Sequence, residues 1–549
     1  MTPRREWALA GPLLAVLLLQ LVWGLRTDGM TDDELVYIGA GYRHVHGDFR
    51  INPEQPPLAK LLGAAALLGL DLVSPAPQKE EDQCGWSYRF IHAANRQAPL
   101  VSRARLPVIV LMLGLAVAIG QWARVVGGPG AGLLALALAA FQPAFLAHGH
   151  LITTDLPGAA AMLAASWALW WFLRAPSLAR AALVAVAVAI AVLTRLTAAI
   201  LGPILLLAVL LEWRTAPDRA RWARGLVQLA LAHLVVVPLV IWATYGFRYA
   251  PFPGDPASYE DWPPGVAAAV VRVAADHHLL PQAFLEGLRF QIDHSQRGHS
   301  GYLLGDRGTS GWWYYYLVVL VAKNTPGFLL LLALAAWRTM RGRISWSPAL
   351  RQWLVAAIAI LLAASAGRIQ IGERYILPVY PFLILWIAVT AAPLLASIRG
   401  RSVVGLCLAA HAFSALSAAP RGYLTYFNPV AAPSAARGEP WVADSNLDWG
   451  QDLPRLAAWM RDHQVARVQL AYFGSDDPDR YGIAHEDLPT WHSHHPIHPP
   501  SSRFHGTVVI SANLLLGFLM PPGKSPYDVF LDRRPDARVG SLLVYDVGE

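Results

Sequence analysis

Long apolar runs alternate with polar segments along the whole chain. Most of these runs approach the roughly 20 residues that a helix needs to cross the hydrocarbon core of a bilayer. The runs lie at 8–25, 106–122, 130–147, 156–173, 181–194, 196–211, 226–245, 312–336, 352–366, 376–397 and 402–418. The pattern therefore predicts an α-helical polytopic membrane protein with about 11 transmembrane helices.

Basic residues gather at alternate ends of these runs. Arg4 and Arg5 precede the first run, and arginine clusters occupy 214–224 and 338–351. Because cytoplasmic loops carry an excess of basic residues, we expect a cytoplasmic N-terminus and an outer C-terminal segment in the inner (plasma) membrane. No small-residue cleavage site follows the first run, which predicts a retained signal anchor.

Three polar segments, at 26–105, 246–311 and 419–549, are then expected together on the outer side. Helical periodicity in the first segment predicts amphipathic helices at 34–46 and 57–70. We expect the chemistry of the protein to lie on this side.

The tail breaks the apolar pattern and predicts a small α/β domain. We expect a helix at 452–462 and strands at 465–473, 507–511 and 541–547. The chain would thus divide into a multi-pass membrane domain, 1–418, which includes the catalytic outer loop 26–105, and an extracytoplasmic domain, 419–549.

Composition supports the membrane assignment and excludes several classes. Hydrophobic residues make up 55% of the chain and charged residues 15%, against about 25% charged in an ordinary soluble domain. The net charge of +7 comes from arginines at the ends of apolar runs, without the continuous basic stripe that nucleic acid would require. Two cysteines exclude a disulfide framework or a cysteine metal site.

A group of acids, Asp32, Asp33 and Glu34, directly follows the first apolar run. A carboxylate can remove the proton of an acceptor hydroxyl as a bond forms, and burial or a neighbouring like charge raises its pKa toward that task. The alternative is that these acids only cap the helix that begins here, since acids are favoured at helix N-termini.

Two further outer segments bring polar side chains to the same interface. Glu54 lies beside a double proline that starts a helix, and Lys60 follows one turn inside it, either to reach a phosphate or to snorkel to lipid headgroups. Asp155 follows His148 and His150 in a short turn between two apolar runs. It is either a helix-start residue or part of a site, and its spacing from the histidines matches no metal template.

Two cations lie in or beside later apolar runs. Lys323 falls within the run 312–336, where a charge is costly unless it faces a partner or a cavity. Arg374 precedes the run 376–397 and could grip a phosphate or pair with Glu373. In the tail, Asp448 belongs to a dense polar turn that either caps a helix or contacts an acceptor.

Taken in order, these segments resemble the polyprenyl-phosphate-dependent glycosyltransferases of family 39, the protein O-mannosyltransferase and aminoarabinose-transferase type, in a bacterial form. The resemblance spans nearly the whole chain, and the order of the motifs is more specific than any one of them. The motifs are Asp33-Glu34, Pro53-Glu54-Gln55-Pro56-Pro57-Leu58, Thr154-Asp155, Gly301-Tyr302-Leu303-Leu304-Gly305, Gly311-Trp312-Trp313-Tyr314-Tyr315, Arg374-Tyr375-Ile376-Leu377-Pro378 and Ser445-Asn446-Leu447-Asp448-Trp449-Gly450-Gln451-Asp452.

The resemblance implies a GT-C fold and an inverting transfer of a sugar from a polyprenyl phosphate to an acceptor. It makes Asp33 the base, with Glu34 in support and Asp155 as a second outer acid. Glu54 matches the acid beside the double proline, although Gln55 stands where the family often has a basic residue or histidine. The departing phosphate would be stabilised by Lys60, Lys323 and Arg374.

The implied partners are a polyprenyl-phosphate-linked sugar, such as a hexose with mannose as one candidate, and an acceptor on a protein, lipid or glycan. Membrane lipids are expected around the chain, nucleic acid is not, and a divalent metal is not required. Two other functions stay open on the sequence alone: a non-enzymatic lipid or oligosaccharide transporter, and a membrane-anchored binding or sensor protein. The transporter gives no reason for acids to gather on the outer loops, and the sensor would bind its ligand through the tail alone.

Overall fold

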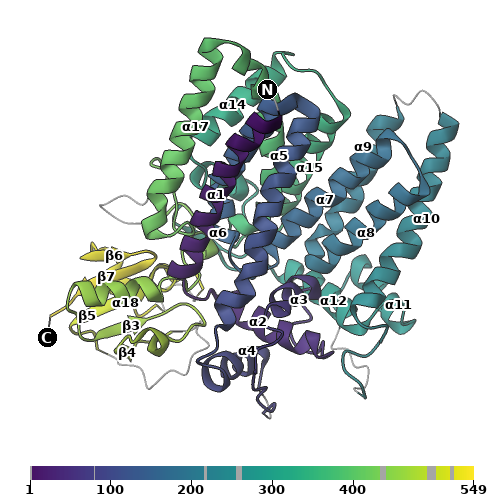
Figure 1. Ribbon diagram of the computed structural model, residues 1–549. Helices are drawn as coiled ribbons and strands as arrows, with labels where there is room; N and C mark the ends of the chain where they lie inside the picture. Colours follow the sequence, from purple (N-terminus) through teal and green to yellow (C-terminus); the bar gives the residue numbers. More distant parts are fainter. Residues whose placement is uncertain are drawn as a thin grey trace.

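A computed structural model describes residues 3–78, 81–214, 219–254, 262–432, 440–490, 503–519 and 525–548. In these residues the chain forms a bundle of long helices with a small sheet beside one end of it (Figure 1). The bundle helices are α1 (Pro3–Thr27), α5 (Leu100–Ala140), α7 (Asp155–Arg174), α8 (Leu178–Thr194), α9 (Leu201–Trp213), α10 (Arg219–Thr244), α13 (Tyr315–Ala322), α14 (Pro326–Met340), α15 (Pro348–Ala366), α16 (Val379–Ala391) and α17 (Ile398–Ala418).

The predicted polytopic architecture is confirmed. Eight helical segments of the described chain are long and apolar enough to cross a membrane, and α8 and α14 are shorter apolar helices. Helix α5 contains the predicted run 106–122 and most of the run 130–147, whose last residues belong to the short helix Pro143–His148.

Helix α5 is in fact a helical hairpin. Its backbone leaves the helical region at Gly128, where φ is 80°. A Cβ added at Gly132 would lie 3.0 Å from the carbonyl oxygen of Gly120, although a straight helix would separate these residues by about 18 Å. The small residues therefore let the two arms approach closely, and the chain reverses between them.

The run 312–336 departs from the expectation of one continuous helix. It is divided into α13 and α14, because Pro326 has no N–H to continue the first helix and Thr325 caps the second by accepting a hydrogen bond from the N–H of Phe328 at 3.1 Å. Lys323 consequently lies in a break between two helices.

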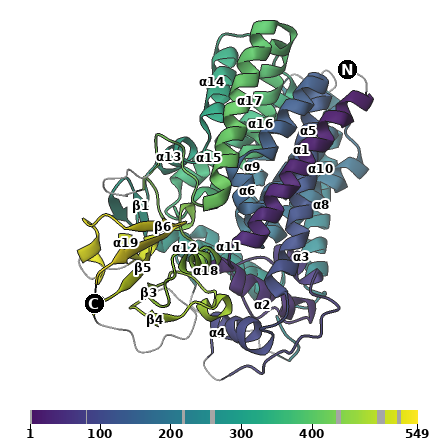
Figure 2. The same cartoon turned by 60° about the vertical axis from the view of Figure 1, so that its left-hand side comes forward.

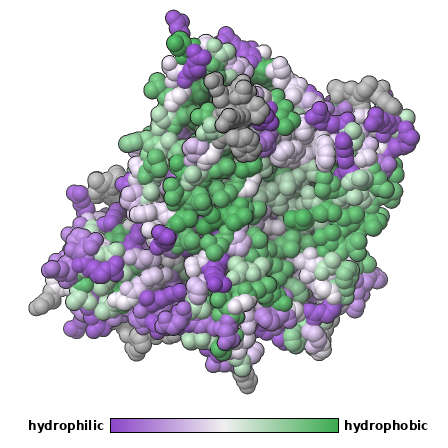
Figure 3. Space-filling model, in the orientation of Figure 1, coloured by the Kyte–Doolittle hydropathy of each residue, from purple (hydrophilic) through white to green (hydrophobic). Residues whose placement is uncertain are grey.

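The polar segments gather at one end of the bundle, as predicted. The N-terminus of α1 lies at the other end, and a broad apolar band separates the two polar ends (Figures 1 and 3). At the same end of the bundle as the sheet lie the shorter helices α2 (Asp32–Val45), α3 (Pro57–Ala65), α4 (Gln83–Tyr88), α11 (Val266–Asp276) and α12 (Gln282–Arg297) (Figures 1 and 2). The two helices predicted in the first loop correspond to α2 and α3.

The C-terminal region contains a sheet of five strands in the order β4-β3-β5-β7-β6. Strand β3 pairs in parallel with β4 and β5, and β7 pairs antiparallel with β5 and β6. Leu456 and Met460 of the adjacent helix α18 form a core with Leu470 and Val509 of the sheet. The elements are α18 (Leu453–Asp462), β3 (Val468–Ala471), β4 (His485–Asp487), β5 (Thr507–Ser511), β6 (Ala537–Val539) and β7 (Leu542–Asp546).

Short elements connect these parts. A two-stranded hairpin precedes α13, and two of the short turns contribute residues to the pocket described below. The short elements are α6 (Pro143–His148), α19 (Ala512–Leu516), β1 (Gly301–Leu303), β2 (Asp306–Gly308), the π-helical turn η1 (Arg89–Ala94) and the 3₁₀ turns η2 (Leu196–Ile200), η3 (Glu373–Ile376), η4 (Ala392–Ala396), η5 (Ala419–Arg421), η6 (Asp444–Asn446), η7 (Pro478–Tyr481) and η8 (Asp528–Phe530).

Candidate active site

A polar pocket lies at the end of the bundle that carries α2, α4 and α12. It encloses about 990 Å³ of space, its open mouth included. Four of the predicted site residues line it: Asp33, Glu54, Asp155 and Arg374. They come from α2, the loop before α3, the start of α7 and the turn η3, so segments from three distant parts of the chain meet here.

The centre of the pocket is an ion pair between Asp33 and Arg374. The Oδ2 atom of Asp33 accepts a hydrogen bond from Arg374 at 2.5 Å, and 28% of the Asp33 side chain stays exposed. Burial raises the pKa of Asp33, and the adjacent Asp32 raises it too, while Arg374 opposes the shift. Asp33 is therefore a carboxylate that faces open space and takes up a proton more readily than usual.

Arg374 keeps donor capacity for a further acceptor. Its guanidinium lies 4.3 Å from the ring of Trp449. Its Nε is buried and has no hydrogen-bond partner among the residues that the structure describes. The hydrogen-bonding capacity of the Arg374 guanidinium is therefore not saturated by the protein.

A second ion pair, between Asp155 and Arg195, lies in the same pocket. Asp155 is the first residue of α7, and Arg195 lies between α8 and η2 with its guanidinium 4.9 Å from the ring of Tyr375. The sequence prediction did not include Arg195 in the site. Its position between two apolar runs was an available indication, because a cation there usually has a functional partner.

Glu54 lines the pocket, but Lys60 lies behind the pocket wall. Glu54 accepts hydrogen bonds from Asn52 at 2.7 Å and from Gln83 at 2.6 Å. The buried Lys60 ammonium donates to the backbone oxygens of Asn52 and Gln55 at 2.6 and 2.7 Å. In the structure Lys60 thus holds the loop that carries Glu54.

Glu34 lies outside the pocket, in a fully buried pair with Arg105. Its two oxygens accept hydrogen bonds from Arg105, from the backbone N–H of Ile152 and from both donors of Thr31. This capping box starts α2 and holds Asp33 in the first helical turn. The structure therefore gives Glu34 a scaffolding position next to the site.

Lys323 and Asp448 also lie outside the residues that line the pocket. The Lys323 ammonium donates to the carbonyl oxygens of Leu424 at 2.7 Å and Asn446 at 2.6 Å. Asp448 is buried, accepts a hydrogen bond from Ser541 at 3.1 Å, and has a pKa raised to about 7 by burial. Both groups join the helical bundle to the C-terminal domain or stabilise that domain.

An apolar pocket adjoins the polar one and is lined by residues of α7, η2, α12 and α15. It encloses about 850 Å³ and shares Thr197, Gln291 and Tyr375 with the polar pocket. Its other lining is mainly apolar and includes Met162 and Ile360. The two pockets together thus form one polar compartment, where arginine side chains could bind an anion, and one apolar compartment next to it within the bundle.

The described residues contain no group of three or more histidine, cysteine, aspartate or glutamate side chains arranged to hold a metal. The His150 ring lies 3.0 Å from Asp28, and the His148 ring packs against Trp449. The two histidines are thus directed toward partners other than Asp155.

Residues 100–242 match the family model for dolichyl-phosphate-mannose-protein mannosyltransferase. This region begins after α2 and contains both Asp155 and Arg195. The family resemblance is confirmed. No curated protein sequence matches the chain.

Solved structures give distant similarities. ArnT from Cupriavidus metallidurans in the apo state has 16% identity and a TM-score of 0.47, with 99% of this chain and 98% of that chain covered. The same figures hold for ArnT bound to undecaprenyl phosphate. The oligosaccharyltransferase AglB from Archaeoglobus fulgidus has 11% identity and a TM-score of 0.45, with 82% of this chain and 58% of that chain covered.

Proposed function

We propose that this chain is an inverting membrane glycosyltransferase that moves a sugar from a polyprenyl phosphate to an acceptor on the outer side of the inner membrane. The observation that carries the proposal is the pocket in which Asp33 and Asp155 face Arg374 and Arg195 beside an apolar extension. The match to a family named for a lipid-phosphate-linked mannose supports the same class of donor.

The donor would bind across the two pockets. Its phosphate would lie against the guanidinium of Arg374, with Arg195 nearby, and its prenyl chain would extend past Tyr375 into the apolar pocket. A lipid tail among apolar side chains and a phosphate beside fixed guanidinium groups are each a favourable match. Lys60 and Lys323 would act through the loops they hold.

Asp33 would act as the general base. The acceptor hydroxyl gives its proton to the Asp33 carboxylate while its oxygen forms a bond to the anomeric carbon. The bond between that carbon and the phosphate oxygen breaks, and its electron pair leaves with the lipid phosphate. Arg374 would stabilise the charge that develops on the leaving group. Attack opposite the leaving phosphate inverts the anomeric configuration.

The decisive experiment uses the purified full-length protein in lipid nanodiscs with a polyprenyl-phosphate sugar as donor. We expect release of polyprenyl phosphate together with a glycosylated acceptor, whose identity follows from mass spectrometry of envelope lipids and proteins from cells with and without the chain. Asp276→Asn, at an exposed carboxylate of α11, is the matched control for Asp33→Asn. Movement of intact donor across the bilayer without bond cleavage would instead identify a transporter and overturn the proposal.

A further inference from the structure

One segment of the C-terminal domain, residues 444–452, contacts both loops that carry the central ion pair. We call it the clamp segment. It begins with the turn η6 (Asp444–Asn446) and ends at the N-cap of α18. The mechanism proposed above uses none of its side chains.

On one side the clamp segment holds the loop of Arg374. The Asn446 Oδ1 accepts a hydrogen bond from the backbone N–H of Glu373 at 2.8 Å, and the Ser445 hydroxyl donates to the carbonyl oxygen of Ile371. Gly372 has a φ of 145°, and a Cβ there would lie 2.3 Å from the Ser445 Oγ. The two turns are therefore packed so closely that only glycine fits between them.

Asn446 is itself fixed by three further contacts. Its Nδ2 donates to the Tyr315 hydroxyl at 3.0 Å and to the carbonyl oxygen of Ala443 at 2.8 Å. Its own carbonyl oxygen accepts the hydrogen bond from Lys323. All these groups are buried, so displacing Asn446 would leave several polar atoms unsatisfied.

On the other side the clamp segment holds the start of α2. The backbone N–H of Asp32 donates to the carbonyl oxygen of Trp449 at 3.0 Å, and that of Gly29 donates to Gln451 at 2.8 Å. The Trp449 side chain meanwhile covers the guanidinium of Arg374. One tryptophan thus contacts Asp32, the neighbour of Asp33, through its backbone and Arg374 through its ring.

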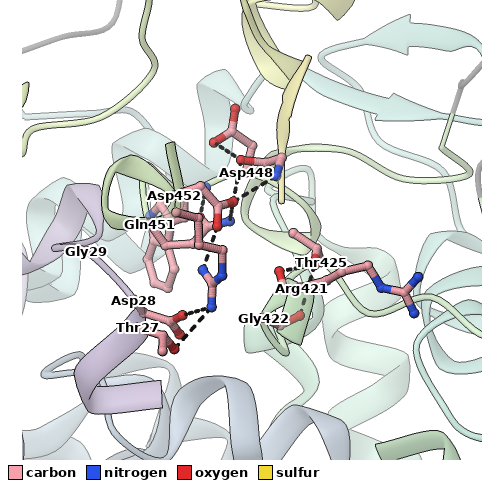
Figure 4. Close-up of polar contacts among 12 residues, drawn as sticks. Thr27, Asp28, Gly29, Arg421, Gly422, Thr425, Asp448, Gln451 and Asp452 are labelled. Atoms are coloured by element: carbon pink, nitrogen blue, oxygen red, sulfur yellow. Dashed lines mark hydrogen bonds and ion pairs between the residues drawn. The ribbon is translucent and has the colours of Figure 1, made fainter. Parts of the chain in front are cut away.

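Buried charges anchor the end of the clamp segment to the bundle. Arg455 of α18 donates to Asp452 at 2.6 Å and to Asp28, at the end of α1, at 2.5 Å. Figure 4 shows Asp28 and Thr27 facing Asp452 and Gln451 across this junction. Because an unpaired buried charge is costly, the domain cannot shift here without losing these contacts.

We infer that the clamp segment positions Asp33 and Arg374 relative to each other, so that the C-terminal domain completes the active site without contacting the reacting atoms. Trp449 and Asn446 are positioning residues in this inference, which rests on the proposed function. If the clamp segment loosens, the Arg374 loop and the start of α2 move independently. Asp33 and Arg374 are then no longer held in a fixed relative position.

Trp449 variants give the first test. Trp449→Leu should lower kcat by about 2- to 30-fold, the range of cation–π contacts from exposed to desolvated, with an unchanged KM for the acceptor. Trp449→Phe keeps an aromatic face and should restore most of the activity. The acid limb of the pH–rate profile should move to higher pH in the leucine variant, because a displaced Arg374 no longer opposes protonation of Asp33. The groups facing Asp33 are Asp32 and Tyr37 of α2, Asp155, Arg195, Arg374 and Tyr375.

Hydrogen–deuterium exchange of Asn446→Ala gives a second test that needs no activity. We expect faster exchange at residues 371–375, where Glu373 loses its acceptor, and also at 28–34 on the opposite side of the clamp segment. Helices α7 and α8 should exchange as in the wild type. A residue of only local importance would affect 371–375 alone, so unchanged exchange at 28–34 overturns the inference.

The two proposals fail in different ways. A wild-type protein without transfer from any polyprenyl-phosphate sugar would remove the proposed function, and exchange at 28–34 would still decide whether the clamp segment couples the two loops. A wild type that turns over, with unaltered kcat and pH profile in Trp449→Leu, would remove the clamp segment from catalysis and leave the transferase standing.

Discussion

Two adjacent acids of α2 each face an arginine, and their surroundings differ completely. The Glu34–Arg105 pair is 0% and 1% exposed, and both oxygens of Glu34 are saturated by hydrogen bonds from Arg105 and the backbone. The Asp33–Arg374 pair is 28% and 10% exposed and faces a pocket.

The electrostatics of the two acids diverge in the same way. Burial raises the pKa of Glu34, but Arg105 and the surrounding donors more than compensate, so the net pKa is lowered. For Asp33 burial prevails over Arg374, and the net pKa is raised. A saturated pair stabilises the fold, whereas a pair with spare coordination can exchange its partner for a substrate, as a general base must.

The largest effect on turnover is expected at the partly exposed pair of Asp33 and Arg374. Asp33→Asn should reduce turnover by about 10²–10⁴-fold, because the amide cannot accept the acceptor's proton. The melting temperature should stay within a few degrees of the wild type, since the side chain is partly exposed. Turnover assays and thermal unfolding on the same preparation check both statements, and unimpaired turnover would exclude Asp33 as the base.

Glu34→Gln, in the buried pair of Glu34 and Arg105, should chiefly lower the stability of the fold. The variant leaves Arg105 buried without its counter-charge, which should cost about 3–5 kcal/mol of unfolding free energy. We expect poor yields of monodisperse protein and a lower melting temperature. If the variant is as stable as the wild type but inactive, Glu34 takes part in the chemistry and the contrast between the two acids is wrong.

Arg374→Gln sharpens the contrast by removing the cation of the partly exposed pair. Turnover should fall by about 10²–10³-fold, the usual cost of losing one preorganised donor at a developing charge. Arg374 lowers the pKa of Asp33, so without it that pKa rises further. The base is then protonated at a higher pH, and the acid limb of the pH–rate profile should move upward. If the acid limb stays in place, Arg374 does not control the protonation of Asp33.

Local patterns in the sequence were sufficient for most of the fold. Apolar runs of bilayer length located the bundle helices, and the short β-branched run at 507–511 located β5 to the residue. Strands β4 and β6 have three residues each, too few for a periodic pattern, and were not predicted. The break at Lys323 was missed although Thr325 and Pro326 are helix-start residues.

The residues of the candidate site could be predicted from the sequence only through the order of the motifs. Spacing cannot show that Asp33 and Arg374, 341 positions apart, form one pair. The same limit applies to the cations: Lys60 and Lys323 were expected at a phosphate, but both donate to backbone carbonyls. A carbonyl acceptor leaves no mark in the sequence, because every residue has one.

Lys60 offers the smallest expected effect and the finest test of this distinction. Lys60→Met should cost about 1–3 kcal/mol of unfolding free energy, because the oxygens of Asn52 and Gln55 lose their buried donor. Since the ammonium lies behind the pocket wall, the KM for the donor should change by less than about 10-fold, equivalent to 1.4 kcal/mol. A larger rise in that KM with unchanged thermal stability would mean that Lys60 leaves its carbonyl partners to bind the donor phosphate. Hydrogen bonds to backbone carbonyls would then not be enough to identify a lysine as purely structural.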